Sequence, residues 1–220
     1  MALYPVMLEL AGRLCVVVGA GSVGMRKTRG LLEAGARVRL VAPDRADAFA
    51  HPDLEWRSRN YDPGDLDGAC LAFAATGDAE VDGRVAADAR AAGIWVNLAA
   101  DPERGDLVLP AVRRLGALTL AAGTGGASPA LAALAADRAA AALGVGWQRL
   151  TALAAALRRA SLTEKRRATY NRNVLHRLIE DGLVELLERG DRQAVDALLR
   201  RHCGLDGLTD LDLDRADLPL

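Results

Sequence analysis

The sequence predicts an α/β protein in which a doubly wound parallel sheet is followed by a mainly helical region. Two observations carry this prediction. Short apolar runs alternate with helical patterns over residues 1–110, which is typical of βαβ units. From residue 129 onward the pattern is almost entirely helical and rich in alanine. We therefore expect a first domain at residues 1–110, an ordinary size for one domain.

A glycine motif directly after the first strand indicates what this domain binds. The apolar run Leu14–Val18 has the length and β-branched content of a buried strand. Gly19, Gly21 and Gly24 follow it as a complete G-x-G-x-x-G, and a helical pattern then runs to Glu33. In a dinucleotide site these glycines permit a tight turn, admit a pyrophosphate and let the helix pack on the strand. The alternative is a glycine turn without a ligand, but the strand before and the helix after the motif favour dinucleotide binding.

The other elements of the first domain follow in order. An apolar lead-in segment at residues 4–10 precedes the first strand. Glycine often ends a helix, and Gly35 and Gly93 each stand directly before an apolar run. We expect a second helix at residues 81–92 and further strands at residues 36–41, 55–59, 71–75 and 94–98.

The second half begins with a short β region. Two strands are expected at residues 106–110 and 117–122, around a basic turn at residues 113–116. Ser128 stands where an N-cap belongs, with Pro129 as the first helical residue. We expect helices at residues 130–143, 146–160, 162–189 and 191–202. Residues 204–220 are acidic and show few structure signals, so a mobile tail is expected there.

Composition and charge limit the classes of function. The net charge is −1 and aromatic residues make up 4% of the chain, so neither a basic field nor stacking platforms predict a nucleic-acid partner. We see no signal peptide and no apolar run of transmembrane length. Cys15, Cys70 and Cys203 have neither disulfide nor zinc spacing. We therefore expect a cytoplasmic protein with no membrane partner and no metal site. The basic run from Arg149 to Arg177 suits a polyanionic ligand or, more commonly, a solvated helix face.

Polar residues near the ends of strands are the candidate ligand groups. An acid about 20 residues after the glycine motif binds the adenosine ribose in dinucleotide sites, and Asp44 stands at that distance. An ordinary turn aspartate is the alternative. Arg45 beside it would suit a 2′-phosphate, so both NAD and NADP fit. Thr76, Asn97 and Asp101 lie at or after carboxyl ends of strands, where ligands bind in open α/β sheets, although capping of loops would also explain them.

Several segments together resemble the siroheme synthase N-terminal module family, the precorrin-2 dehydrogenases and sirohydrochlorin ferrochelatases. The segments stand in the family's order between Pro5 and Arg138. They read VVVGAGSVGMRK, LLEAGARVRLVAP, YDPGDLDG, LAFAATGDAEVDGRV, GIWVNLAADP, DLVLPAVRRLG and GTGGASPALAALAADR. The last of them is far more specific than the glycine motif.

The resemblance implies a three-part, stand-alone protein. A Rossmann domain at residues 1–110 would bind NAD, residues 111–148 would form a central dimerisation segment, and residues 149–203 a helical domain ahead of the tail. The implied homodimer removes two hydrogens from precorrin-2, passes hydride to NAD and releases sirohydrochlorin. Some members of the family also insert ferrous iron.

The resemblance also implies site residues, which are carried over position by position. The matching positions are Ser22 and Val23 for the phosphate loop, Pro43 and Asp44 for the adenosine side, and Arg114 and Ser128 for the substrate side. Ser128 is also counted among the catalytic candidates, with Asn97 and Asp101. An arginine suits precorrin-2, because that substrate carries many carboxylates.

One departure from the family pattern concerns the catalytic group. The family usually reads Asn-x-x-Asp ahead of a proline, and that aspartate is assigned to dehydrogenation and chelation. With Asn97 and Pro102 held in register, this position is Ala100, and Asp101 stands one residue along. Three outcomes stay open. Asp101 acts as the base, the dehydrogenation needs no carboxylate, or the chain is a non-catalytic tetrapyrrole-binding or carrier module.

Overall fold

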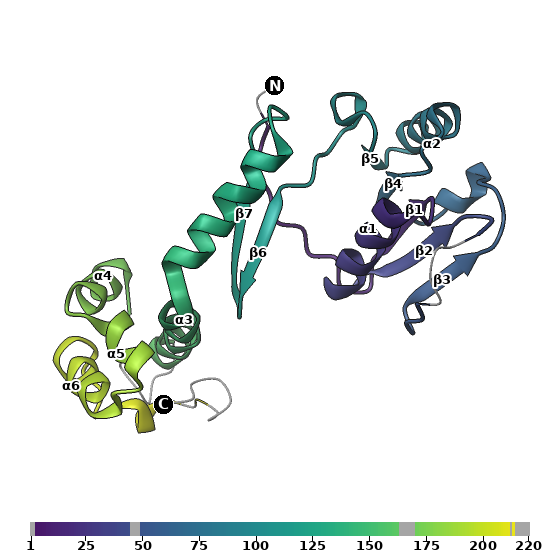
Figure 1. The fold of residues 1–220 in the computed structure, drawn as a ribbon. Helices are drawn as coiled ribbons and strands as arrows, with labels where there is room; N and C mark the ends of the chain where they lie inside the picture. The colour runs from purple at the N-terminus through teal and green to yellow at the C-terminus, as the bar shows by residue number, and fades with distance from the viewer. Residues whose placement is uncertain (1–2, 45–48, 163–169, 212, 214–220) are drawn as a thin grey trace. The chain divides into compact units, whose positions relative to one another are not determined.

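The computed structural model describes residues 3–44, 49–162, 170–211 and 213, and the chain divides into two compact units (Figure 1). Unit 1 is Met1–Leu109 and unit 2 is Pro110–Leu220. Among the described residues, unit 1 contains two buried clusters of apolar side chains and unit 2 contains a third.

A five-stranded parallel sheet with the order β3-β2-β1-β4-β5 is the centre of unit 1. Its strands are β1 (Leu14–Val18), β2 (Arg37–Val41), β3 (Leu54–Arg57), β4 (Leu71–Ala74) and β5 (Trp95–Leu98). The central strand β1 pairs with β2 on one side and with β4 on the other. This sheet confirms the predicted doubly wound fold, since strands that are apolar on both faces need cover on both faces.

Helices and a short turn provide that cover. Helix α1 (Ser22–Glu33) lies on one face of the sheet, and helix α2 (Ala79–Ala91) with the 3-10 turn η1 (Pro63–Leu66) lies on the other. Met25 of α1 belongs to one buried core and Val85 of α2 to the other. The sheet is therefore closed on both faces, and its exposed groups lie at the ends and edges of the strands.

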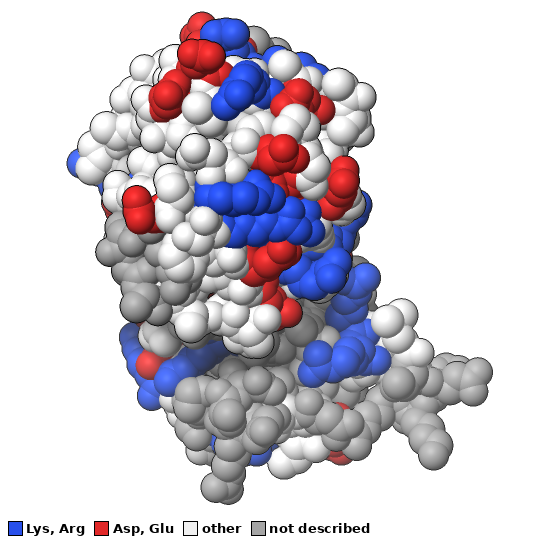
Figure 2. Space-filling view, turned by 90° about the vertical axis from the view of Figure 1, so that its right-hand side faces the viewer, with Lys and Arg blue, Asp and Glu red and all other residues white. Residues whose placement is uncertain are grey.

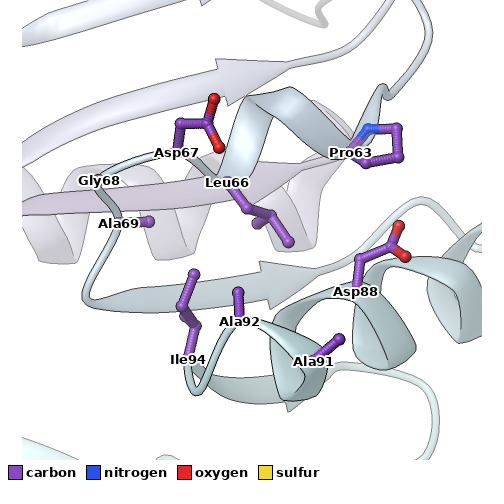
Figure 3. Close-up of a pocket in the computed structure, with 9 residues that line it drawn as sticks. All are labelled: Pro63, Leu66, Asp67, Gly68, Ala69, Asp88, Ala91, Ala92 and Ile94. Carbon is purple, nitrogen blue, oxygen red and sulfur yellow. The ribbon is translucent and has the colours of Figure 1, made fainter.

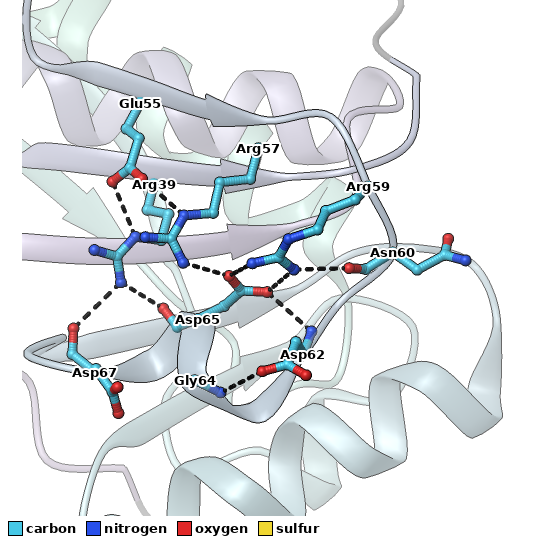
Figure 4. A network of polar contacts seen from close by, with 9 residues as sticks. All are labelled: Arg39, Glu55, Arg57, Arg59, Asn60, Asp62, Gly64, Asp65 and Asp67. Atoms are coloured by element: carbon cyan, nitrogen blue, oxygen red, sulfur yellow. Dashed lines mark hydrogen bonds and ion pairs between the residues drawn. The ribbon is translucent and has the colours of Figure 1, made fainter.

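Charged side chains from β2, from β3 and the residues after it, and from η1 pair with one another (Figure 4). The carboxylate of Asp65 is fully buried and accepts hydrogen bonds from Arg57 at 2.6 Å and from Arg59 at 2.6 and 2.7 Å. A backbone N–H of the same turn also donates to it, at 2.9 Å. Burial would raise the pKa of Asp65, but these donors outweigh burial and hold the pKa below its usual value. Arg39 joins by donating to Glu55 and to the backbone carbonyl of Asp65. We call these five side chains the Asp65 cluster.

Unit 2 opens with an antiparallel hairpin of β6 (Ala111–Leu115) and β7 (Leu118–Ala122). The predicted strand at residues 106–110 is wrong, because Asp106 folds back to β5, where its N–H donates to the carbonyl of Val96 at 2.8 Å. The predicted basic turn is wrong as well. The turn is at Gly116, which has φ 58°, and the arginines at 113 and 114 lie in β6.

In the described residues after the hairpin the α-helices are α3 (Pro129–Ser161), α4 (Arg172–Glu180), α5 (Leu183–Arg189) and α6 (Arg192–Cys203). Gly144, with φ 60° and ψ −172°, interrupts α3 between the two helices that the sequence predicts. The single helix predicted at residues 162–189 is broken, and residues 163–169 within it lie outside the described residues.

The break in the predicted helix has a conformational cause. Gly182 adopts φ 86°, a left-handed conformation that ends α4 and starts α5 in a new direction. Helix α5 packs closely on α3 at Gly146, which has no side chain to keep the two helices apart. A Cβ on Gly146 would lie 2.6 Å from the carbonyl oxygen of Val184. The α3–α5 contact therefore requires glycine at this position.

The first part of the predicted tail is packed rather than mobile. Leu205, Leu208 and Leu211 are buried in the same core as α3, α4, α5 and α6. The N–H of Leu208 donates to Asp196 at 2.7 Å, in the short 3-10 turn η3 (Leu208–Asp210). The leucines recur every third residue among the acids, so one side of the segment is apolar. Residue 212 and residues 214–220 lie outside the described residues.

Helix α3 is long and apolar enough, by length and composition alone, to cross a membrane, which the sequence pattern did not indicate. The interruption at Gly144 divides it, and only 17% of its most apolar window is buried. Leu131 and Leu134 in its first half are 57% and 60% exposed. This half of α3 therefore presents an apolar surface without cover from the described residues of its own chain.

Charge is mixed on the face of the molecule seen in Figure 2. Basic and acidic side chains lie beside one another there, in keeping with the net charge of −1. A nucleic-acid partner would need an extended field of one sign. The absence of such a partner stays a prediction.

Candidate active site

The glycine motif forms a loop whose backbone geometry demands glycine. Gly19 has φ 102°, and a Cβ there would lie 2.4 Å from the carbonyl oxygen of Ala75. A Cβ on Gly24 would lie 1.9 Å from the carbonyl oxygen of Gly19. Neither position accepts a larger residue without a shift of backbone. The loop between β1 and α1 is therefore held tightly against the loop after β4.

The start of α1 has the features of an anion site. Gly21 is its N-cap, no side chain caps the helix, and no acid stands in its first turn. A Cβ on Gly21 would meet nothing within 4 Å, so the backbone there faces open space. Ser22 and Val23, the next two residues, are exposed. Uncapped N–H groups and the positive end of the helix dipole favour a phosphate at this place.

The loop after β2 carries the predicted adenosine contacts. Pro43 and Asp44 are exposed there, and the hydroxyl of Ser58 donates to the carbonyl of Pro43 at 2.9 Å. The indole N–H of Trp56 donates to the carbonyl of Ala42 at 3.1 Å. The neighbouring strand therefore holds this loop and leaves Asp44 open. Arg45, the candidate for a 2′-phosphate contact, lies outside the described residues.

Thr76 lies in the loop after β4 with its hydroxyl already engaged. The hydroxyl donates to Asp82 at 2.7 Å, and the N–H of Thr76 donates to the same carboxylate oxygen at 3.1 Å. Asp82 is buried in α2.

Asp78 caps helix α2, which therefore starts two residues before the predicted start. Sequence reasoning missed Asp82. The signal that could have found it is an acid in the first turn of a helix, four residues after a cap.

The fourth loop follows β5 and contains the departure from the family pattern. Ala100 is exposed and Asp101 partly exposed, with the Asp101 carboxylate 3.9 Å from the guanidinium of Arg104. Asn97, by contrast, is buried at 4% exposure. Its amide donates to the carbonyl of Leu107 at 2.9 Å. Asn97 is thus occupied by its own chain, and Asp101 is the candidate that faces outward.

The loops after β1, β2, β4 and β5 stand at one end of the sheet, which we call the carboxyl edge. The fold brings together there the candidates at positions 19 to 24, 43, 44, 76, 97 and 101. Two candidates lie in unit 2. Arg114 is exposed in β6, and Ser128 caps α3 by accepting a hydrogen bond from the N–H of Leu131 at 3.2 Å. The roles of all these residues stay proposals.

A hollow of ≈ 490 Å³ lies elsewhere on unit 1 (Figure 3). It is lined by Pro63, Leu66, Asp67, Gly68, Ala69, Asp88, Ala91, Ala92 and Ile94. These residues stand near the amino ends of β4 and β5, whereas ligands of open α/β sheets bind at the carboxyl ends. The carboxylates of Asp67 and Asp88 would also repel a pyrophosphate. We therefore place no cofactor in this hollow.

Within the part of the chain that the structure describes, no three His, Cys, Asp or Glu side chains gather closely enough to hold a metal ion.

Comparisons with known proteins agree on one family. Residues 6–111 match the family model described as putative NAD(P)-binding. Siroheme synthase of Chromobacterium violaceum is 35% identical over 211 residues, which cover 94% of this chain and 45% of that protein. Siroheme synthase of Azotobacter vinelandii is 38% identical over 154 residues, 68% of this chain and 33% of that protein. The chain thus spans less than half the length of these curated relatives.

A solved structure extends the likeness over both units. The protein described as SirC, precorrin-2 dehydrogenase, matches with a TM-score of 0.66 and 27% sequence identity. The match covers 83% of this chain and 92% of that chain. The likeness to a dehydrogenase therefore reaches beyond the nucleotide-binding sheet into the helical region.

Proposed function

Because the chain belongs to the siroheme synthase N-terminal module family, we propose that it oxidises precorrin-2 to sirohydrochlorin with NAD as the hydride acceptor. The observation that carries the proposal is the match to a precorrin-2 dehydrogenase over 92% of that protein's chain. The siroheme synthases extend well beyond the region that this chain covers, so the proposal is limited to dehydrogenation.

NAD fits the chemistry of the carboxyl edge. The uncapped start of α1 faces open space and suits a pyrophosphate, and the exposed carboxylate of Asp44 suits the ribose hydroxyls. A carboxylate at that place would repel a 2′-phosphate, which favours NAD over NADP. When bound, NAD supplies the acceptor for the hydride. The residues that would hold it are Gly19, Gly21, Ser22, Val23, Gly24, Pro43, Asp44 and Thr76.

The substrate side needs cations and a proton acceptor. Precorrin-2 is a polycarboxylate, and Arg114 supplies a guanidinium for one of its carboxylates. Ser128 offers a hydroxyl at the start of α3 for a further contact. Loss of hydride from the macrocycle leaves a proton to be removed, and Asp101 is the carboxylate in the loop where the family places one. Iron insertion is left out of the proposal, because the matched structure is described as a dehydrogenase and the position of the family's chelating aspartate is Ala100 in this chain.

The direct test mixes the purified protein with precorrin-2 under anaerobic conditions, with and without NAD, and follows sirohydrochlorin absorbance. Product that forms only with NAD is expected. Absence of NAD-dependent product would overturn the proposal.

Ala100 favours a second candidate, a non-catalytic module that binds or carries the tetrapyrrole. This candidate predicts tight binding of sirohydrochlorin without turnover, and it predicts that Ala100→Asp creates activity. Turnover by the unmodified protein would remove this candidate.

We also propose that the protein is a homodimer. The exposed leucines of α3 support this, because a contiguous apolar surface of this kind marks an interaction site. The lead-in segment is also apolar and exposed, with Tyr4 at 89% and Met7 at 76% exposure. Light scattering should report twice the monomer mass. A monomer at micromolar concentration would contradict the proposal.

A cytoplasmic location is proposed on the state of the thiols. The described cysteines are free, and Cys15 and Cys203 are buried. Burial and the neighbouring Cys70 raise the pKa of the Cys15 thiol to about 12, so this thiol is poorly reactive. Free, protected thiols of this kind suit a reducing compartment.

A further inference from the structure

One part-buried contact at the carboxyl edge joins the helix after the glycine motif to β5. The ammonium of Lys27 in α1 donates to the side-chain oxygen of Asn97 in β5 at 2.6 Å. It also lies 5.5 Å from the centre of the Phe73 ring, over its face. Phe73 pairs with Asn97 in the register of β4 and β5. A lysine that begins on α1 therefore reaches across β4 to the edge strand of the sheet.

Enclosure of the ammonium shows that this contact is part of the packing. Burial and the neighbouring Arg26 lower the pKa of Lys27. A lysine on a helix surface would ordinarily extend into water. Here the hydrogen bond to Asn97 and the Phe73 ring replace part of the lost hydration.

Asn97 also binds the segment of residues 106–107, where the chain returns along β5. Both ends of its buried amide are used, since the oxygen accepts from Lys27 and the nitrogen donates to the carbonyl of Leu107 at 2.9 Å. Leu107 lies where the chain comes back along β5. On the same stretch, the N–H of Asp106 donates to Val96 at 2.8 Å.

The loop between these anchors contains the proposed proton acceptor. At its start, the N–H of Ala99 donates to the carbonyl of Ala74 at 3.0 Å. Asp101 itself has no side-chain hydrogen bond to the helix turn that follows it. Its backbone carbonyl accepts a hydrogen bond from the N–H of Arg104 at 3.2 Å, and Arg90 of α2 donates to the carbonyl of Arg104 and, at 3.2 Å, to the carboxylate of Asp106. The loop is therefore held at several points, and Lys27 acts on its return end through Asn97.

We infer that Lys27 is a positioning residue, which through Asn97 sets the loop of residues 99–107 against the phosphate loop at the start of its own helix. Gly24 and Lys27 stand in the same turn of α1, so one rigid element carries both the end of the glycine motif and the contact to the loop. This inference rests on the proposed function, in which the cofactor and Asp101 must meet the substrate together.

The test compares Lys27→Met with Lys27→Arg, and uses Arg26→Met as the matched control. Arg26 is an exposed cation on the same helix. With Lys27→Met we expect kcat for precorrin-2 to fall about tenfold while the Kd for NAD stays within about twofold. Amide hydrogen exchange of residues 99–107 should rise about tenfold, with the exchange of β1 unchanged. Lys27→Arg should keep kcat and the exchange of residues 99–107 close to those of the unmodified protein. Arg26→Met should change neither kcat nor this exchange.

A double-mutant cycle with Asn97→Leu separates this role from a general loss of packing. We expect the effects of Lys27→Met and Asn97→Leu on exchange to be non-additive, because both break the same path. Additive effects, or unchanged exchange in Lys27→Met, would overturn the inference. The exchange measurement needs no turnover. An unmodified protein that fails to oxidise precorrin-2 would therefore refute the proposed function and leave the Lys27 contact to be decided on exchange.

Discussion

The Asp65 cluster and the carboxyl edge are two polar regions of the same sheet, and they are built in opposite ways. In the Asp65 cluster every charge meets a partner at hydrogen-bond distance, and the central carboxylate is removed from water. At the carboxyl edge the helix start is uncapped, Asp44 is open, and Asp101 has only a distant arginine.

This difference distinguishes side chains that stabilise the fold from groups that are available to bind a ligand. A buried charge with all its partners in place is costly to disturb, because removal of one member leaves the others uncompensated. A backbone donor that faces open space contributes little to folding and gains a partner only when an anion arrives. Substitutions in the Asp65 cluster should therefore lower stability and leave NAD binding unchanged. Substitutions at the carboxyl edge should weaken ligand binding or catalysis and leave stability unchanged.

Asp65→Ala should have the largest effect. We expect the free energy of unfolding to fall by about 3–5 kcal/mol, because the guanidinium groups of Arg57 and Arg59 lose their buried partner. Urea denaturation followed by circular dichroism measures this. Asp67→Ala is the control, since Asp67 is an exposed carboxylate close by, and it should change stability by less than about 0.5 kcal/mol. Equal effects of the two variants would show that the cluster does not hold the fold.

Asp101→Asn should lower kcat by about 100-fold, the usual contribution of a general base, with stability and the Kd for NAD unchanged. Steady-state assays of sirohydrochlorin formation measure this. Glu103→Gln removes another exposed acid of the same loop and should leave kcat as it is. An unchanged rate in Asp101→Asn would remove Asp101 from the site and favour a dehydrogenation that needs no carboxylate.

Gly24→Ala should weaken NAD binding by about 2 kcal/mol, or about 30-fold, because the new methyl group must displace the backbone of the phosphate loop. Titration calorimetry with NAD measures the affinity. Gly30→Ala lies in the same helix with nothing within 4 Å of the added Cβ, and it should bind NAD normally. Normal NAD binding by Gly24→Ala would contradict the assignment of this loop to the cofactor.

Lowering the pH should reduce, gradually, the stability that the Asp65 cluster contributes. The folded protein lowers the pKa of Asp65, so its contribution to stability is present above the unfolded pKa of about 3.9 and is lost as pH falls through the folded value. The stability difference between the unmodified protein and Asp65→Ala should therefore be constant near neutral pH and shrink below about pH 4. Unfolding curves at several pH values measure it, and a difference that grows toward acid would have the wrong sign.

Local patterns explain why so much of unit 1 could be predicted. The strand β1 and the glycine motif are contiguous in sequence, and the steric demand at Gly24, where a Cβ would meet the carbonyl oxygen of Gly19, lies within the turn itself. The contact from Lys27 to Asn97 could not be predicted, because it joins residues 70 positions apart and depends on how α1 lies across β4.

Two segments show where predictions from the local sequence were wrong. The segment after residue 204 looked like an acidic tail, yet Leu205, Leu208 and Leu211 are spaced to form one apolar side and are buried. The strand expected at residues 106–110 failed because Asp106 pairs with β5, a partner that the local sequence does not identify. In both places the deciding contacts come from other elements of the fold, which the local pattern does not identify.

The proposed reaction transfers hydride from precorrin-2 to NAD. A single-turnover reaction, with the protein in excess over precorrin-2 and NAD saturating, tests it by recording NADH and sirohydrochlorin together. We predict that the two products rise with the same rate constant and reach equimolar amounts. Sirohydrochlorin that is bound but not formed, or formed without NADH, would contradict hydride transfer to NAD.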